Sequence, residues 1–200
     1  LRRAEDEAVC RRLFEAYYGD RLPATSFVIQ PPCGGQSLAI EAWALGGKNA
    51  DIQFISPNVV SAAYDGLRWI HIGGITPPKN VTSPYEQSRH VFEEMVARLD
   101  LAEASFRDVV RTWLYIGGIT EIQNGIERYR ELNRARTDVF NTQHAKGRMP
   151  VGSNDQVCYP ASTGIGMSSP GLDIGCLALQ SDRDDVLLVS LENPEQTAAF

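Results

Sequence analysis

The sequence predicts a mixed α/β protein in which one β-sheet is covered on one face by two helices. In several short runs apolar residues occupy every second position, which is typical of strands. In two longer runs they recur every three or four positions, which is typical of helices. The order of the main runs is two strands, a helix, a strand, a helix and two strands. We therefore expect a layered fold with both helices on the same face of the sheet.

The composition excludes several functional classes. The chain has 200 residues, of which 43% are hydrophobic and 22% charged, as in ordinary globular domains. A net charge of -6 argues against nucleic acid or an anionic membrane as a partner, because both need a concentrated basic surface. No apolar run approaches the roughly 18 residues that span a bilayer, so we expect a cytoplasmic protein. The cysteines and histidines lack zinc-binding spacing, and we expect free thiols, no metal and no cofactor.

Two pairs of similar segments suggest an internal repeat. Residues 23–26 (PATS) resemble residues 160–163 (PAST). In both segments the Pro-Ala dipeptide leads into an apolar run. Residues 40–45 likewise resemble residues 174–179. The two segments of this pair are separated by nearly the same length of chain as the two segments of the first pair. A repeat of this length indicates two related halves.

The first 50 residues predict one helix and two strands. Apolar residues over residues 4–18 follow helical spacing, and Gly19 stands where a helix would end, so we expect a helix with one buried stripe. Strands are expected over residues 25–30 and 38–45, the second because alternate residues are apolar. We interpret residues 1–47 as the C-terminal part of a first half.

The rest of the chain, residues 48–200, is interpreted as a second, catalytic half that is truncated at its C-terminus. It opens with two strands, residues 58–64 and 67–73. Between them stand Asp65 and Gly66, a dipeptide that tolerates the positive φ angles of a two-residue hairpin turn.

Two helices follow in this half. Ser83 is expected as the N-cap of the first, with Pro84 at its first position and Glu86 as the reciprocal member of a capping box. This helix is expected to end within residues 100–103. The second helix is expected over residues 126–140, where apolar residues recur at spacings of three and four.

The remaining strands are expected over four short segments, residues 108–116, 159–166, 174–180 and 185–191. In the first of them, Arg111, Trp113 and Tyr115 face away from Leu114 and its apolar neighbours. Because the two helices cover only one face of the sheet, the other face needs a cover. The first half, a missing segment or identical subunits could supply it.

Arg111 is the first candidate for a binding residue. A guanidinium on a central strand beside Trp113 and Tyr115 is costly to bury unless it meets an anion. The alternative is a structural ion pair with a carboxylate of this chain. Arg136 lies on an apolar helix stripe, where its guanidinium is likewise costly to bury without an anion. Two guanidiniums facing one cleft would suit a dicarboxylate.

Three further features could carry chemistry. Tyr115 could donate its phenol to a substrate oxygen, or it could belong to the core. His71 alternates away from its apolar neighbours and could act as an acid or base, or it could be satisfied by a backbone carbonyl. The third feature is the start of the strand over residues 159–166, which consists of Ala161, Ser162, Thr163 and Gly164. These residues offer backbone N–H groups and two hydroxyls to a ligand, or they form only a tight start of the strand.

Five blocks between Gly66 and Gln180 resemble one family. In order, the blocks are RWIHIGGITP, EQSRHVFEEM, FRDVVRTWLYIGGI, RYRELNRARTDVF and YPASTGIG. Together they resemble the FkbO-type chorismatases, whose halves are similar to the YjgF/RidA fold. The resemblance implies a duplicated RidA-like (chorismate-mutase-like) mixed sheet with two helices on one face, of which the first copy is partial.

The resemblance also implies the substrate and the residues that hold it. Chorismate would be hydrolysed at its enolpyruvyl ether to pyruvate and a dihydroxycyclohexadiene- or hydroxybenzoate-type carboxylic acid, without metal or organic cofactor, in secondary metabolism. Tyr115 is implied as the catalytic residue. Arg111, Arg136 and residues 161–164 are implied as substrate-binding residues. A monomer with pseudo-symmetric halves and a homo-oligomer both remain open.

Two alternative functions remain. RidA enzymes carry an arginine after the Pro-Ala of the strand entrance, where this chain has Thr25 and Ser162, so an enamine or imine deaminase is disfavoured. The other alternative is a non-catalytic module that binds a metabolite. The catalytic glutamate of chorismatases belongs to a later segment, and we expect it beyond Phe200 rather than at Glu192.

Overall fold

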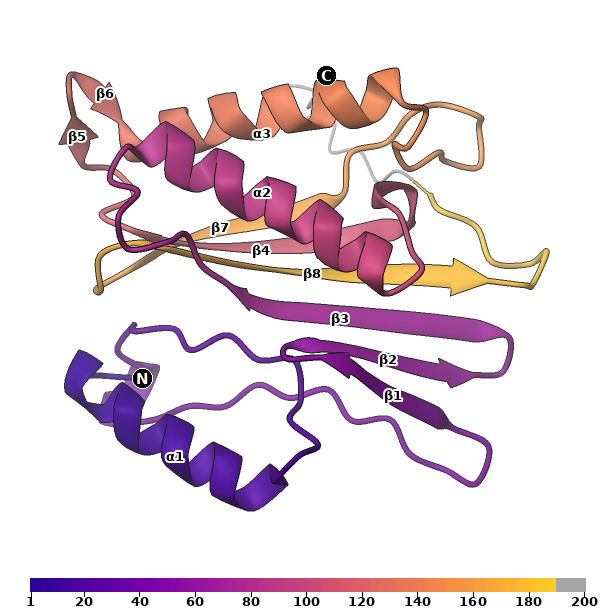
Figure 1. Ribbon diagram of the computed structural model, residues 1–200, viewed down its shortest axis with the longest axis horizontal. Coiled ribbons are helices and arrows are strands. Elements are labelled where there is room, and N and C mark those ends of the chain that lie inside the picture. Colours follow the sequence, from indigo (N-terminus) through magenta and orange to yellow (C-terminus); the bar gives the residue numbers. More distant parts are fainter. Residues whose placement is uncertain (190–200) are drawn as a thin grey trace.

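The computed structural model describes residues 1–189 and confirms the mixed α/β class (Figure 1). Its helices are α1 (Glu7–Tyr18), α2 (Pro84–Leu101) and α3 (Arg128–Ala145), with 3-10 turns at Ala4–Asp6, Cys33–Gly35 and Phe106–Asp108. Its strands are β1 (Asp51–Ser56), β2 (Val59–Tyr64), β3 (Leu67–Ile75), β4 (Val109–Gly117), β5 (Ile122–Gln123), β6 (Ile126–Glu127), β7 (Ala161–Met167) and β8 (Leu172–Ser181). Within this part of the chain, no helix is both long and apolar enough to cross a membrane.

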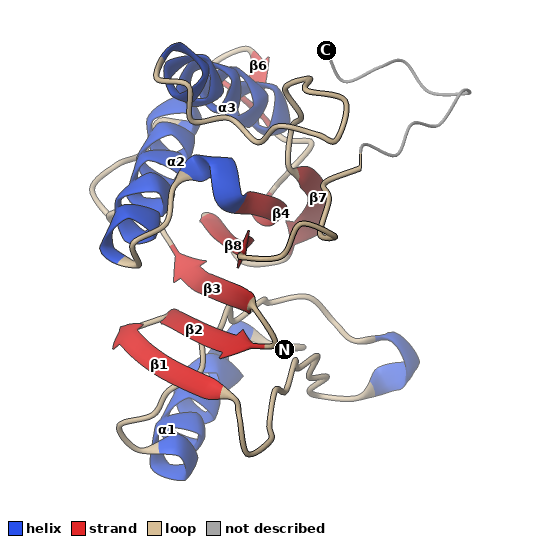
Figure 2. Cartoon of the chain, turned by 90° about the vertical axis from the view of Figure 1, so that its right-hand side faces the viewer, coloured by secondary structure: helices blue, strands red, loops and turns tan. Residues whose placement is uncertain are grey.

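Six of these strands form one sheet in the order β1-β2-β3-β8-β4-β7. All neighbours are antiparallel except β4 and β7, which are parallel. The strand β8 comes last in the sequence but lies between β3 and β4. Helices α2 and α3 both cover the same face of this sheet, as predicted (Figures 1 and 2).

The main hydrophobic core lies between this face and the two helices. The buried face of α2 is the one that the helical spacing indicates, and its fully buried residues are Val91, Phe92, Met95 and Leu99. On α3, the ring of Phe140 lies 6.0 Å from that of Phe92 and 4.8 Å from that of Phe106. Burial of each such side chain stabilises the fold by roughly 1.5–3 kcal/mol relative to exposure.

Local sequence signals for turns and helix starts are largely confirmed. Asp65 and Gly66 have φ angles of 52° and 72° and join β2 to β3. Ser83 caps α2 by accepting a hydrogen bond of 3.5 Å from the backbone N–H of Glu86. The reciprocal half of the capping box is absent, because the Glu86 carboxylate instead accepts a hydrogen bond of 2.7 Å from Arg89.

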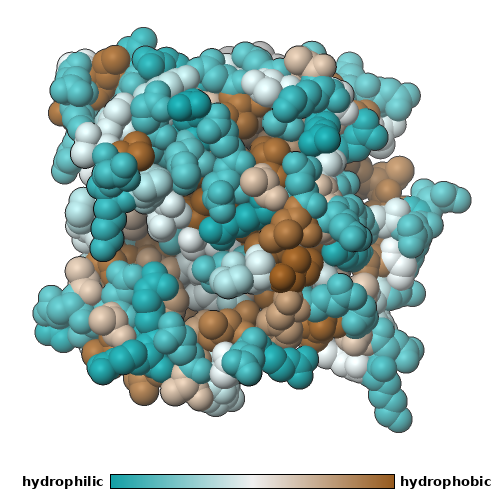
Figure 3. All heavy atoms as spheres, viewed as in Figure 1, coloured by the Kyte–Doolittle hydropathy of each residue, from teal (hydrophilic) through white to brown (hydrophobic). Residues whose placement is uncertain are grey.

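The predicted first half requires correction. The helix is present and Gly19 ends it with a φ of 58°, but none of the side chains of α1 is buried. The predicted strands over residues 25–30 and 38–45 are wrong, because both segments run outside the sheet without a neighbouring strand. In residues 38–45, where apolar residues alternate, the side chain of Ile40 is 78% exposed and that of Trp43 is 62% exposed. Figure 3 shows apolar patches on an otherwise largely hydrophilic surface.

Three further boundaries differ from the prediction. The sequence did not indicate β1, which forms one edge of the sheet, or the short pair β5 and β6. Helix α3 begins later and runs further than residues 126–140. Residues 185–189 form no strand, and residues 190–191 lie outside the described residues.

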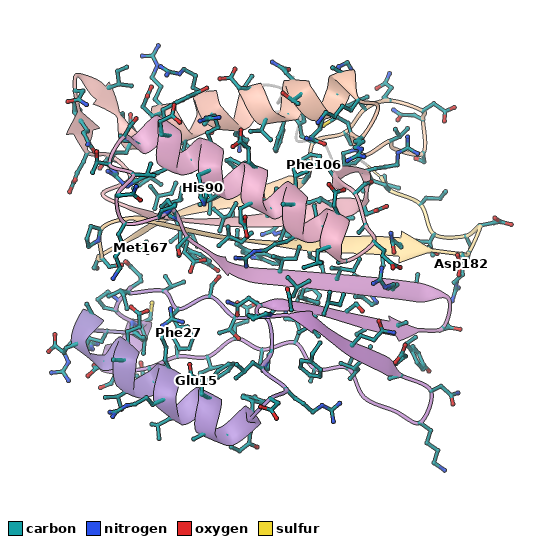
Figure 4. All side chains as sticks on the ribbon, in the orientation of Figure 1. Glu15, Phe27, His90, Phe106, Met167 and Asp182 are labelled. Carbon is teal, nitrogen blue, oxygen red and sulfur yellow. The ribbon has the colours of Figure 1, made fainter. Side chains whose placement is uncertain are left out.

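Part of the N-terminal segment covers the sheet face opposite the helices (Figure 2). Thr25 lies close to β3, because a Cβ atom added to Gly73 would stand 2.9 Å from the backbone nitrogen of Thr25. Next to it, the Ser26 hydroxyl accepts a hydrogen bond of 3.0 Å from the backbone N–H of Gly74. Phe27 of the same segment projects toward α1 (Figure 4). Of the three expected covers, the N-terminal segment is the one present at this end of the sheet.

We expect Gly73→Ala to lower the free energy of unfolding by about 1–3 kcal/mol, because the added methyl group meets the Thr25 backbone. Gly46→Ala is the matched control. The space around Gly46 is open, so the change should stay within about 0.5 kcal/mol. Urea unfolding followed by tryptophan fluorescence measures both. Equal stability of the two variants would show that Thr25 does not pack on β3.

Candidate functional site

Strand β4 directs its polar and apolar side chains to opposite faces, as predicted. Leu114 is only 1% exposed and belongs to the core under the helices. Arg111, Trp113 and Tyr115 are half-buried on the other face, which we call the helix-free face. This face, rather than the helix-covered one, holds the ionisable groups described below.

Arg111 is partly buried and lacks a carboxylate partner. Its Nη2 donates a hydrogen bond of 2.6 Å to Thr163 Oγ1 on β7, and its guanidinium carbon lies 5.6 Å from the centre of the Trp113 ring. Within residues 1–189, Arg111 forms no salt bridge, so the structural ion pair considered above is not what holds it. The charge is therefore available to an external anion.

Alternation also divides the residues of the β7 entrance. Thr163 lies on the helix-free face with Arg111. Ser162 points to the helix-covered face, where its Oγ is 2.6 Å from the hydroxyl of Thr112. Gly164 faces the same way, and a Cβ atom there would stand 3.3 Å from the Tyr129 ring of α3. The residues predicted to bind substrate at the start of β7 therefore point to opposite faces of the sheet and do not all face one ligand.

Arg136 lies on the other side of the sheet from Arg111. It is half-buried on α3, two helical turns after Tyr129, and it forms no hydrogen bond or ion pair with another residue in the described part of the chain. Ala161 is exposed and pairs with Arg111 in the sheet register. The two guanidiniums do not face one cleft in this structure.

Asp173 on β8 is a functional candidate that the sequence analysis missed. It is only 4% exposed, and its Oδ1 accepts a hydrogen bond of 2.7 Å from the Ser26 hydroxyl. Burial raises the pKa of its carboxyl from 3.8 to about 7, although the Ser26 hydrogen bond and Arg11 act in the opposite direction. An acidic residue inside the apolar run LDIGCLAL was the signal that could have identified it.

Tyr115 is the register partner of Asp173 on the neighbouring strand. Burial raises the pKa of its phenol, and the carboxylates of Asp173 and Glu41 raise it further. The phenol therefore keeps its proton at neutral pH and can donate a hydrogen bond.

His71 lies on the helix-free face of β3. It pairs with Leu177, which pairs in turn with Arg111, so the three residues form one row across β3, β8 and β4. The indole of Trp43 meets the His71 ring edge-on, with 5.4 Å between the ring centres. Burial lowers the pKa of the imidazole. His71 has no hydrogen bond to a backbone carbonyl within residues 1–189, so that alternative is not supported.

A pocket of about 390 Å³ lies elsewhere, at the ends of β2, β3 and β8. Two of its charged groups, Arg68 and Asp65, already have partners. Arg68 donates hydrogen bonds of 2.9 Å to the carbonyl of Ala102 and to Gln180, and Asp65 pairs with Arg183 at 2.7 Å. No set of three metal-ligating side chains occurs among the described residues. The helix-free face, where Arg111 lies without a salt bridge among residues 1–189, is therefore the better candidate.

On one face of a mixed sheet, Arg111 lies without a salt bridge among residues 1–189 and Tyr115 keeps its phenolic proton, an arrangement suited to bind an organic acid. The chain matches a family model over residues 57–178, and the model is described as "Chorismatase FkbO/Hyg5-like, N-terminal". This match covers more than half of the sequence, and the chain belongs to the FkbO/Hyg5-like chorismatase family. The matched segment contains Arg111, Tyr115 and Asp173. No curated protein matches the sequence.

Several solved structures are similar to this chain. One is Rv2704 of Mycobacterium tuberculosis, a member of the YjgF/YER057c/UK114 family, with 19% identity, 59% of this chain and 82% of that chain covered, and a TM-score of 0.40. Another is Escherichia coli TdcF with bound serine, at 15% identity, 60% and 86% coverage and a TM-score of 0.44. A third is yeast Mmf1, at 17% identity, 60% and 85% coverage and a TM-score of 0.42.

We expect Asp173 to make the stability of the fold depend on pH. Its raised pKa means that the folded protein holds a proton which the unfolded chain releases above pH 3.8. Between that pH and about 7, the free energy of unfolding should therefore fall by up to about 1.4 kcal/mol per pH unit relative to the Asp173→Asn variant. Above about pH 7 the difference should level off.

Urea unfolding at a series of pH values measures this difference. Asp20→Asn, at an exposed position of the same chain, is the control and should follow the wild-type curve. Parallel curves for the wild type and Asp173→Asn would show that the carboxyl titrates as it does in the unfolded chain.

Proposed function

We propose that this protein is a chorismatase that cleaves the enolpyruvyl ether of chorismate to pyruvate and a cyclic carboxylic acid. Membership of the chorismatase family supports the reaction class. The observation that carries the proposal is the Arg111 guanidinium, which is partly buried beside Trp113 and has no carboxylate partner within residues 1–189. A carboxylate of the substrate would provide that partner.

The helix-free face offers the other groups that a cyclic carboxylic acid needs. Trp113 provides an aromatic surface beside Arg111, and the Thr163 hydroxyl already binds the guanidinium and keeps it oriented. Tyr115 can donate its phenolic proton in a hydrogen bond to an oxygen of the substrate. These residues come from the two neighbouring strands β4 and β7, which hold them on a rigid support.

Hydrolysis of an enol ether begins with protonation of its terminal carbon, which leaves an oxocarbenium ion. Water adds to this cation, and the resulting hemiketal collapses to pyruvate and an alcohol. The site therefore needs an acid near the methylene carbon and cations that hold the carboxylates. Tyr115 is proposed to bind the oxygen that becomes the alcohol. The family's catalytic glutamate is the proposed carbon acid. Glu192, which the sequence analysis considered, lies outside the described residues.

Arg111→Ala should weaken chorismate binding by about 2 kcal/mol or more, because it removes one member of a desolvated charge pair. Isothermal titration calorimetry measures the affinity. Arg107→Ala is the control, because Arg107 is exposed and bonds only a backbone carbonyl. Arg136→Ala tests the other side of the sheet. If Arg136→Ala lost affinity and Arg111→Ala kept it, the ligand would bind between α3 and β7 instead.

The reaction itself is tested by mixing the protein with chorismate and following pyruvate release. We expect turnover by the full-length gene product, and a much lower rate from residues 1–200 alone if the gene encodes a longer chain. Binding without pyruvate release by the full-length product would favour the non-catalytic alternative. Activity on imines derived from amino acids would favour the deaminase.

A further inference from the structure

We propose that His71 is a second positioning residue on the helix-free face, which takes up a proton when a dicarboxylate binds and holds the carboxylate that Arg111 does not reach. This inference rests on the proposed function and adds a specific partner for the second charge of the ligand. The sequence analysis had assigned that second contact to Arg136, which the structure places on the opposite side of the sheet.

The sheet register sets the geometry of this pair. His71 and Arg111 flank Leu177 in one row, so their backbones are two strand spacings apart, which is about 10 Å. Between them lies the apolar side chain of Leu177, which is buried, and in the next row Gly175 contributes no side chain. A six-membered ring with one carboxylate on the ring and another on an ether arm has the right order of length to bridge the two cationic groups.

His71 has free hydrogen-bonding capacity for this role. Within residues 1–189, its ring nitrogens have no hydrogen-bond or ion-pair partner, and its one recorded contact is the edge-on packing of Trp43. No hydrogen bond joins the two side chains within the described residues, so this ring contact leaves the imidazole nitrogens available to a ligand.

The electrostatic environment links the proton to the ligand. Burial is the cause of the lowered pKa of His71, so the ring is neutral in the empty site at pH 7. The other ionisable groups on this face are Arg111, Tyr115, Asp173 and Glu41. Three charged groups of the N-terminal segment also lie against it: Arg11 and Glu7 act on Asp173, and Arg21 lies over the ring of Phe54, which is in the same row as His71. A carboxylate bound between His71 and Arg111 compensates for the burial of the ring and raises the pKa of the imidazole.

Calorimetry in two buffers of different ionisation enthalpy tests the inference at pH 7. Chorismate binding to the wild-type protein should take up roughly half a proton or more. In His71→Gln the uptake should disappear and the affinity should fall about tenfold. His144→Gln changes an exposed histidine of α3 and should behave as the wild type. Asp173→Asn should keep the uptake, which distinguishes His71 from the neighbouring carboxyl.

NMR titration of the His71 ring in the wild-type protein provides a second measurement that does not depend on a variant folding. Saturation with chorismate should raise its pKa by at least about one unit. Binding without proton uptake, an unmoved His71 resonance, or equal uptake by wild type and His71→Gln would overturn the inference while leaving the proposed function standing. Absence of chorismate binding to the wild-type protein would overturn both.

Discussion

Side-chain alternation in β4 and β8 is the constraint on which both the core and the candidate site depend. Leu114 and Ile174 pair in the sheet and point toward the helices, whereas Tyr115 and Asp173 pair and point away. A slip of one residue in either strand would exchange these faces. It would bring Arg111 into the core and expose the apolar residues. The hydrophobic core therefore fixes the orientation of the ionisable groups.

The N-terminal segment modifies the face that this alternation creates. Ser26 receives a hydrogen bond from Gly74 and donates one to Asp173, so a single hydroxyl joins the segment to two strands. Burial of Asp173 raises the pKa of its carboxyl to about 7, and the hydrogen bond from Ser26 opposes part of that rise. In a different row of the same face, Arg111 forms no salt bridge within residues 1–189. The same face thus contains a carboxyl that prefers to be neutral and a guanidinium that needs an anion.

The sequence predicted those features that depend on local chemistry. The Asp65-Gly66 turn, the start of α2 at Ser83 and the two faces of β4 follow from backbone preferences and periodicity. The alternation over residues 38–45 failed as evidence for a strand, because a strand also needs a neighbour with which to form hydrogen bonds. Contacts between distant segments, such as Ser26 with Asp173, were beyond the same reasoning. Of the residues that the sequence singled out, the structure places Arg111, Tyr115 and Thr163 on one face and Arg136 on the other side of the sheet.

Protonation of either Asp173 or His71 makes the charge of the helix-free face more positive. Asp173 loses its negative charge as the pH falls below about 7, and protonation of His71 adds a positive charge. Each change makes the face more favourable for an anion. The consequences differ, however. Burial is the largest cause of the raised pKa of Asp173 in the free protein, whereas burial keeps His71 neutral, and we propose that a bound carboxylate compensates for that burial. The carboxyl therefore couples proton binding to folding, and the imidazole couples it to the ligand.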